Sequence, residues 1–352
     1  MLYDTQDYFL WSLLYSLNNK FDRIINLNFL YSLFKDSLNK ELNIFHLKNS
    51  ELLLLLNTHL NKTKLQDKKK KEILKIFAND LNQLKIQVKK ELELCEENGI
   101  KYITYEQTEY FTKLKALKNP PFIIFYKGFL PTEQELVNSL AIIGSRDSVP
   151  YSEAIAEKSG KLLSEHKIWN ISGLALGCDT SGHKGSLLGG GKTGAVLAAG
   201  LSSKIYPAKN RPLAEEILYN KGFLMSELCP SIPLIKVFLI DRDRLQSALT
   251  DGIFVIQCGL KSGTLHAVNT AIELRKKIFV WYPLKENIID LKKLEGNEAL
   301  IKNKFYKLDN LKLNKISSYE IISISNGNAL LNKIAKKIEK HIPSFESIPL
   351  KF

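Results

Sequence analysis

Short apolar runs alternate with turns and helical patterns through the middle of the chain, from about residue 140 to 283. An apolar run of four to six residues, bounded by glycine or serine, is typical of a strand buried on both faces of a sheet. Apolar runs that alternate with helical patterns predict a parallel sheet covered by helices. The predicted strands are 140–143, 168–172, 194–198, 223–226, 252–257 and 278–281, the last of which is expected to complete the sheet.

Helical patterns separate these strands, and we expect helices over 152–166, 183–188, 212–220, 241–249 and 264–276. In such α/β sheets, ligands bind at the carboxyl ends of the strands, where the loops lead into the helices. The loops after the predicted strands are therefore the first places to look for a binding site.

The first hundred residues have a different period. Apolar residues recur every three or four positions over 9–17 and 29–34, which predicts helices, and a further helix is expected over 72–95. The lysine run at 68–71 fits a solvated helix face better than a nucleic-acid contact. Asn98-Gly99 ends the helical pattern, and short strands are expected over 100–104 and 122–126. Weaker patterns after 283 predict helices over 291–303 and 327–341, and 342–352 is predicted to be a tail.

The charge favours an anionic partner. The 352 residues carry a formal net charge of +13, and the basic excess is spread along the chain. Nucleic acid is the first class of partner to consider, although a generally basic surface explains the charge equally well. The four cysteines are far apart and predict neither a zinc site nor a disulfide framework. No apolar run is long enough to span a membrane, and the N-terminus lacks the basic start of a signal peptide. We therefore expect a cytoplasmic protein without a membrane partner. We also expect that it has no cofactor.

Three loops of the predicted sheet contain the small residues that let a phosphate approach the backbone, and two of them also carry a positive charge. The first contains Gly144, Ser145 and Arg146, whose guanidinium suits a bidentate phosphate contact. The second runs through Gly173 and Gly177, and the third contains Lys261, Ser262, Gly263 and Thr264. An ordinary turn explains any one of them, but three on one sheet edge indicate an anion site.

Other candidates favour structural roles. Gly191-Lys192-Thr193 looks like the end of a P-loop, but Ser186 stands where the first glycine belongs and a strand follows instead of a helix. Asp179 is expected to cap the helix after its loop rather than to act in catalysis. Core or capping roles are also the simpler interpretation of His183 and His266, and no catalytic triad stands out.

Taken in order, these motifs resemble the DprA/Smf family, the DNA-processing protein A of bacterial natural transformation. The resemblance covers about residues 98–310, and its motifs are 119–121, 125–128, 141–146, 172–179, 190–193, 195–197, 205–207 with Asn210, 226–227, 242–244 and 261–264.

The resemblance implies an α/β fold, an extended Rossmann-like and mainly parallel sheet with helices on both faces, preceded by a small all-α module. It divides the chain into a helical N-terminal module at 1–105, a Rossmann-like DNA-binding domain at 106–310, and a short, mostly helical segment at 311–352 without a full winged helix. It also implies binding of single-stranded DNA without catalysis, protection of incoming DNA, a homodimer, and loading of the RecA recombinase in natural transformation.

The resemblance also implies roles for individual residues. Arg146 and Lys261 would contact phosphates, and Arg242 and Arg244 would flank the pocket. Gly177, Asn210 and Arg211 are further candidates for the binding site. The pocket itself would be shaped by the small residues of the loops, which are Gly144, Ser145, Gly173, Ser262, Gly263 and Thr264.

Two departures from the family pattern keep other interpretations open. Arg242-Asp243-Arg244 stands where the family usually has Arg-Asn-Arg, which places an acid at the rim, and His266 replaces a small or apolar residue. A member with a degraded DNA site, serving as an interaction scaffold, is one alternative. Another is a Rossmann-like nucleotide or nucleoside-phosphate hydrolase that uses the same loops, with Asp179, Glu227 or His266 at the crevice.

Overall fold

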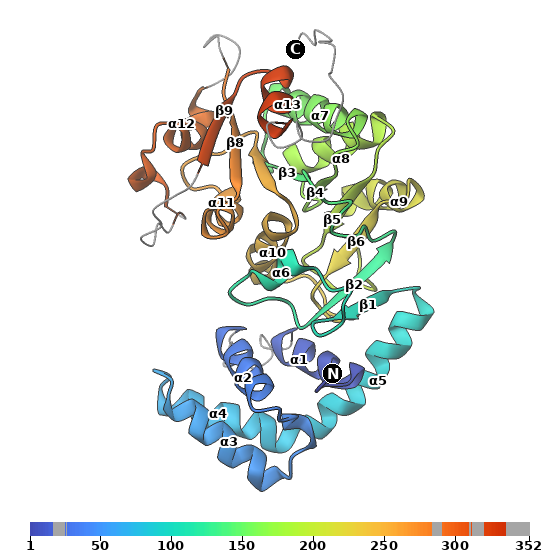
Figure 1. The fold of residues 1–352 in the computed structure, drawn as a ribbon, viewed down its shortest axis with the longest axis vertical. Helices are drawn as coiled ribbons and strands as arrows, with labels where there is room; N and C mark the ends of the chain where they lie inside the picture. The colour runs from blue at the N-terminus through green and yellow to red at the C-terminus, as the bar shows by residue number, and fades with distance from the viewer. Residues whose placement is uncertain (17–24, 26, 284–290, 310, 312–319, 336–352) are drawn as a thin grey trace.

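A single nine-stranded sheet runs through the computed structural model, which describes residues 1–16, 25, 27–283, 291–309, 311 and 320–335. Its strand order is β1-β2-β6-β5-β4-β3-β7-β8-β9 (Figure 1). The seven strands from β6 to β9 are parallel to one another, whereas β2 pairs antiparallel with β6 and β1 antiparallel with β2. The predicted α/β class with a mainly parallel sheet is therefore confirmed.

All six predicted strands of the central region are present. They are β3 (Leu140–Ile143), β4 (Asn170–Ser172), β5 (Thr193–Val196), β6 (Phe223–Ser226), β7 (Gly252–Val255) and β8 (Lys277–Trp281). Nearly every residue in them is buried, as expected for strands covered on both faces.

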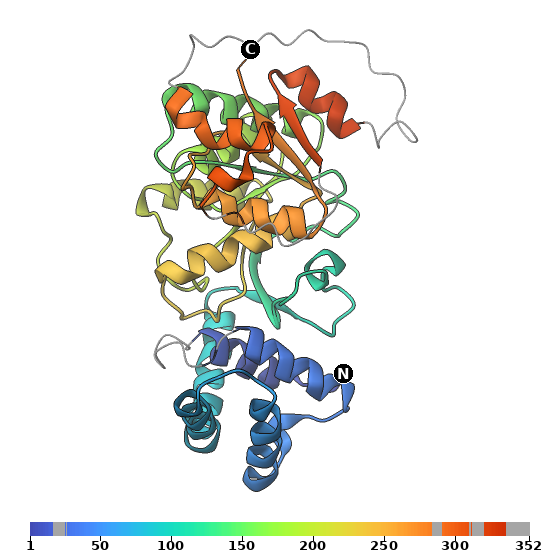
Figure 2. The ribbon, with the colours of Figure 1, turned by 90° about the vertical axis from the view of Figure 1, so that its left-hand side faces the viewer.

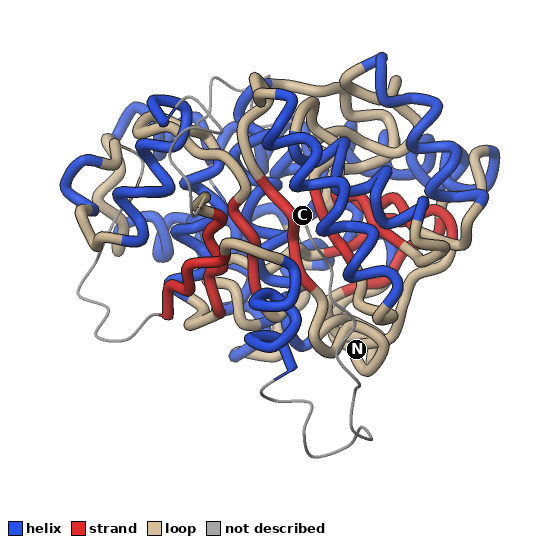
Figure 3. Tube along the Cα trace, turned by 90° about the horizontal axis from the view of Figure 1, so that it is seen from above, coloured by secondary structure: helices blue, strands red, loops and turns tan. Residues whose placement is uncertain are grey.

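Helices cover both faces of this sheet, and Figure 3 shows the strands lying between the two layers. Alternate side chains of β3 divide between the layers: Leu140 and Ile142 pack with the layer that contains α7, and Ala141 and Ile143 with the layer that contains α11. One layer consists of α7 (Pro150–Glu165), α8 (Cys178–Leu188), α9 (Arg211–Tyr219) and α13 (Gly327–Ala335). The other consists of α6 (Thr112–Lys115), α10 (Lys236–Leu249), α11 (Thr264–Glu273) and α12 (Glu295–Ile301).

Two helices begin earlier than predicted. The helix expected at 183 begins at Cys178, and the helix expected at 241 begins at Lys236. Gly182 and Gly185 weaken the helical pattern of α8, but they serve its packing. A Cβ on Gly185 would collide with the backbone of Glu157 in α7, so glycine lets the two helices approach closely.

The sheet also extends further than predicted. The strand at 278–281 does not complete it, because β9 (Glu320–Ile324) pairs in parallel with β8 over five residues. Side chains of β9 alternate between buried and exposed positions, so this edge strand lacks the continuous apolar run of the central ones. The segment 311–352 therefore contributes a strand as well as α13, whereas the predicted tail at 342–352 lies outside the described residues.

The N-terminal residues form the predicted helical module, seen at the end of the molecule that carries the N-terminus in Figures 1 and 2. Its helices are α1 (Thr5–Ser16), α2 (Leu27–Asn39), α3 (Asn49–Asn61), α4 (Asp67–Lys75) and α5 (Leu81–Glu97), with a π-helical turn (Ile76–Asp80) between the last two. β1 (Lys101–Thr104) follows and pairs with β2 (Ile123–Gly128). The predicted boundary between residues 105 and 106 thus falls between two strands of one sheet.

The helical module shares a hydrophobic core with the sheet. Phe9 of α1 packs edge-on against Phe125 of β2, with 5.1 Å between the ring centroids. Polar bonds join the same parts: the Ser12 hydroxyl donates to the Glu227 carbonyl at 3.0 Å, and the Ser231 amide donates to the buried Glu91 carboxylate at 2.9 Å. No helix among the described residues is long and apolar enough to cross a membrane.

Candidate nucleic-acid interface

The predicted loops meet where the strand order reverses. β3 lies between β4 and β7, so chain segments leave this point of the sheet in opposite directions. In open α/β sheets, ligands bind in the crevice outside the carboxyl ends of the strands at such a switch point. The loops after β3, β4 and β7 are the three predicted from the sequence, and the sheet brings them side by side.

Gln257, which follows β7, holds the first loop in place. Its backbone carbonyl accepts from the Ser145 amide at 2.8 Å, and its side chain accepts from the Val149 amide at 3.0 Å and donates to the Asp147 carbonyl at 3.1 Å. The interpretation of the sequence missed this residue, although a buried glutamine at the end of an apolar strand is a signal for such a role.

Gly144 and Gly177 allow the first two loops to touch. A Cβ on Gly144 would lie 2.5 Å from the Cys178 Sγ, and one on Gly177 would collide with the Ser145 carbonyl. Gly177 also has a φ of +75°, a conformation that favours glycine. Both predicted glycines are therefore required where the first loop packs closely against the amino end of α8.

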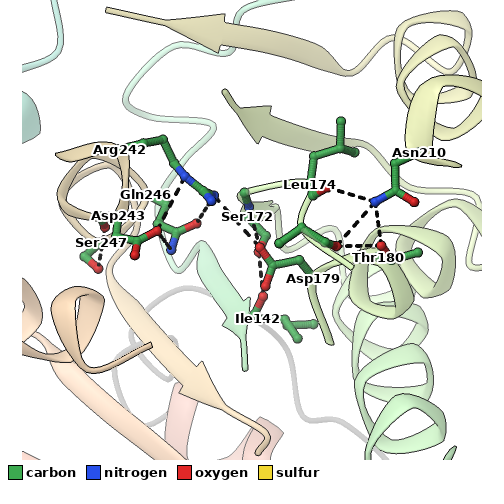
Figure 4. Close-up of polar contacts among 12 residues, drawn as sticks. Ile142, Ser172, Leu174, Asp179, Thr180, Asn210, Arg242, Asp243, Gln246 and Ser247 are labelled. Atoms are coloured by element: carbon green, nitrogen blue, oxygen red, sulfur yellow. Dashed lines mark hydrogen bonds and ion pairs between the residues drawn. The ribbon is translucent and has the colours of Figure 1, made fainter. Parts of the chain in front are cut away.

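Asn210 is buried and supports the second loop from behind. Its side-chain amide donates to the Leu174 carbonyl at 2.8 Å and to the Thr180 hydroxyl at 2.7 Å (Figure 4). Leu174 has a φ of +57°, unusual for a bulky residue, and the bond to its carbonyl helps to hold that conformation. The predicted site residue Asn210 thus positions the loop and does not face solvent.

Asp179 has a different task from the predicted one. It does not cap α8, because the N-cap residue of this helix is Gly177 and no side chain bonds to the free amides of its first turn. Instead its carboxylate accepts from the Gly173 amide at 3.0 Å and lies 3.9 Å from the Arg242 guanidinium. Because α8 begins at Cys178, Asp179 already belongs to the helix and points back toward β4.

Arg242 fills the space beside Gly173. Its side chain is 4% exposed, and a Cβ on Gly173 would collide with the guanidinium. The guanidinium also lies 3.4 Å from the Asp243 carboxylate and donates to the Gln246 side chain at 3.2 Å (Figure 4). Arg242 is thus enclosed by two acids and an amide.

Arg244 is held in a second buried pair, where it donates to the Glu227 carboxylate just after β6. Nearby, the Tyr15 hydroxyl of α1 donates to Asp241 at 2.8 Å, so this cluster lies against the helical module. Arg242 and Arg244, both predicted to flank the pocket, belong to buried ion pairs that support the loops from within.

Burial dominates the acid–base behaviour of these groups. It raises the pKa of Asp243 from 3.8 to about 7, opposed by the positive charges of Arg242 and Arg146. It raises the pKa of Glu227 to about 7 against the opposing charge of Arg244. Burial lowers the pKa of His183 to about 3, so this histidine is neutral and bonds to the Thr193 hydroxyl at 2.8 Å, in the core role expected for it.

The cations that face solvent are different ones. Arg146 is exposed on the first loop, and Lys261 is 83% exposed on the third, 3.5 Å from Asp309. Ser262 and Thr264 bond to each other, and the Thr264 amide donates to the Ser262 hydroxyl at 3.2 Å, which shapes the start of α11 after Gly263. Arg211 is exposed at the start of α9. The carboxyl edge of the sheet therefore exposes Arg146, Lys261 and Arg211, while hydrogen bonds within the loops hold their backbone in place.

A Rossmann-like sheet with these loops at its switch point defines the class of protein, and comparison with known proteins identifies the family. The family described as DNA recombination-mediator protein A matches residues 101–316, more than half of the chain. The protein belongs to this family, as its resemblance to DprA/Smf proteins predicted.

Similar proteins carry the same family names. Protein Smf of Borreliella burgdorferi is 33% identical over 175 residues, which cover 49% of this chain and 54% of that protein. DNA processing protein DprA of Bacillus subtilis is 31% identical over 183 residues, which cover 52% and 61%. The chain thus matches little more than half the length of these curated relatives.

Two solved structures share the fold. The structure of DprA from Streptococcus pneumoniae matches with a TM-score of 0.67 and 21% identity, and covers 93% of this chain and 97% of that one. DNA processing protein A from Helicobacter pylori, whose structure concerns its single-stranded DNA binding mode, matches with a TM-score of 0.54 and 25% identity over 67% and 97%.

Proposed function

We propose that this protein binds single-stranded DNA along the carboxyl edge of its sheet, and that binding rather than turnover is its function. The observation that carries the proposal is the meeting of three anion-ready loops at the switch point, with Arg146 and Lys261 exposed beside them. Phosphates would lie against the backbone of these loops and pair with the two cations. The net charge of +13 and the single-stranded DNA binding mode of the Helicobacter pylori relative support the same ligand.

The groups that a hydrolase would need have other partners. Asp179 accepts from the Gly173 amide and faces Arg242, and Glu227 accepts from Arg244. His266 lies half-buried on α11. These bonds favour a binding protein over the alternative of nucleotide hydrolysis.

Membership of the family extends the proposal. The chain would act in the cytoplasm as a homodimer that protects incoming DNA and helps to load the RecA recombinase during natural transformation. Protection of the DNA and loading of RecA are proposed from family membership. The candidate residues of the loops would serve the binding of the strand, on which both steps depend.

The first test replaces both exposed cations with glutamine, which removes charge but keeps much of the side-chain length. Arg146→Gln/Lys261→Gln is expected to weaken binding of a labelled single-stranded oligonucleotide, measured by fluorescence anisotropy across a range of salt. The slope of log affinity against log salt is about −0.7 per phosphate contact on single strands, so the loss of two contacts should make the slope less negative by about 1.4.

Lys221→Gln/Arg275→Gln is the matched control. It removes two exposed cations that precede β6 and β8, at the opposite edge of the sheet, and should leave the salt slope unchanged. Equal losses in both double variants would show that overall charge, and not the loops, carries the binding. A duplex of the same sequence tests the preference for single strands.

A further inference from the structure

A hollow lies next to the proposed strand-binding loops, at the carboxyl end of β5. The residues that follow β5 line it together with Gly173 of the second loop: Leu197, Ala198, Ala199, Gly200, Lys204 and Tyr206. β5 pairs directly with β4, so the hollow continues the row of loops by one strand. It contains none of the residues of the first and third loops.

The lining combines three kinds of group that suit a nucleotide. Tyr206 is 54% exposed although it is a large aromatic residue, and its ring is therefore available for contact. Lys204 is exposed beside it, and Arg242, which is paired with Asp179 and Asp243, forms part of the wall. Leu234 and Leu239 add an apolar surface.

We propose that this hollow is a nucleotide subsite of the same DNA track, in which Tyr206 stacks on a base and Lys204 pairs with its phosphate. The inference rests on the proposed binding of single-stranded DNA at the loops. Proteins that bind single strands without sequence preference combine a positive groove with aromatic side chains on which bases stack, and Tyr206 supplies the aromatic surface that the three loops lack.

The spacing of the sheet fits a continuous strand. From β7 through β3 and β4 to β5 is three strand spacings, about 14 Å at roughly 4.8 Å each. Stacked nucleotides rise about 3.4 Å each, so roughly four would reach from the loop of Lys261 to Tyr206. Lys209 and Arg211 are also exposed just beyond Tyr206, so positive charge continues past the hollow.

The test compares Tyr206→Leu with Tyr206→Phe in the full chain, using labelled oligothymidine. Loss of one base–aromatic contact should weaken binding by about tenfold in Tyr206→Leu, whereas Tyr206→Phe keeps the ring and should bind within about twofold of wild type. Lys204→Gln should make the slope of log affinity against log salt less negative by about 0.7. With 5-iodouracil in the oligonucleotide, ultraviolet light should cross-link wild type at the peptide that contains Tyr206.

Unchanged affinity in Tyr206→Leu, together with cross-links elsewhere, would overturn the subsite. Equal losses in the leucine and phenylalanine variants would point to the hydroxyl and overturn stacking. If wild type binds and only Arg146→Gln/Lys261→Gln loses affinity, the subsite fails while the proposed function stands. If wild type does not bind single strands at all, both fail.

Discussion

Replacing Arg242 with methionine is expected to lower the free energy of unfolding by about 3–5 kcal/mol, because it removes the cation from a buried cluster of charges. The Arg242 guanidinium is 4% exposed and lies 3.9 Å from Asp179 and 3.4 Å from Asp243. Methionine has a similar volume but leaves both carboxyl groups without their partner. Urea unfolding followed by circular dichroism at neutral pH measures the change.

Arg211→Met is the control, since Arg211 is exposed and its loss should change the free energy of unfolding by no more than about 0.5 kcal/mol. The double variant Arg242→Met/Asp179→Asn should recover part of the loss, because it also removes one of the uncompensated acids. If Arg242→Met were as stable as wild type but bound DNA poorly, Arg242 would be a DNA ligand and not a support for the loops.

Replacing Asp243 with asparagine is expected to stabilise the protein above neutral pH. Burial raises the pKa of Asp243 from 3.8 to about 7, so the folded protein keeps a proton that the unfolded chain releases between these values. Stability therefore falls as the pH rises from about 4 to 7, and the cost of this group is fully present above 7. Asparagine removes a cost of up to about 4 kcal/mol at pH 8 and changes little at pH 4.

Urea unfolding of wild type and Asp243→Asn between pH 5 and 8 measures this difference. The variant should flatten the pH dependence without abolishing it, because the raised pKa of Glu227 acts with the same sign. Asp67→Asn, an exposed carboxylate on α4, should follow the wild-type curve. Parallel curves for wild type and Asp243→Asn would contradict the assignment.

The same variant tests the departure from the family's Arg-Asn-Arg pattern. The charge of Arg146 acts on Asp243, so an ionised Asp243 opposes a phosphate beside that arginine. Asp243→Asn should therefore bind single-stranded DNA more tightly than wild type at pH 8, and by a smaller margin at pH 6. This expectation separates a working DNA site from the degraded one that the acid suggested.

The sequence predicted the parts of the fold that carry strong local patterns. Apolar runs marked the central strands, and glycine-rich turns marked the loops at the switch point. β9 was not predicted, because an edge strand with alternating burial has no continuous apolar run. The start of α8 was predicted too late, because Gly182 and Gly185 weaken its helical pattern. These small residues are required by the close packing of α7 against α8.

Side-chain partners were harder to predict, because they join positions far apart in the chain. Arg242 and Arg244 were expected to flank the pocket, but each is paired with an acid more than fifteen positions away: Asp179 for Arg242 and Glu227 for Arg244. Asn210 reaches back over thirty residues to Leu174. The charge of the sequence therefore predicted an anionic ligand, but it could not predict which cations are exposed and which are paired with buried acids.

Hydrogen–deuterium exchange with and without a saturating single-stranded oligonucleotide is the most direct measurement of where the strand lies. We expect slower exchange in peptides that contain 144–149, 173–177 and 258–264, because the proposed strand would cover these loops and suppress their local opening. Peptides that contain 190–193 and 220–222, before β5 and β6 at the opposite edge, should exchange unchanged. Protection confined to the N-terminal helices or to that opposite edge would contradict DNA binding at the carboxyl edge of the sheet.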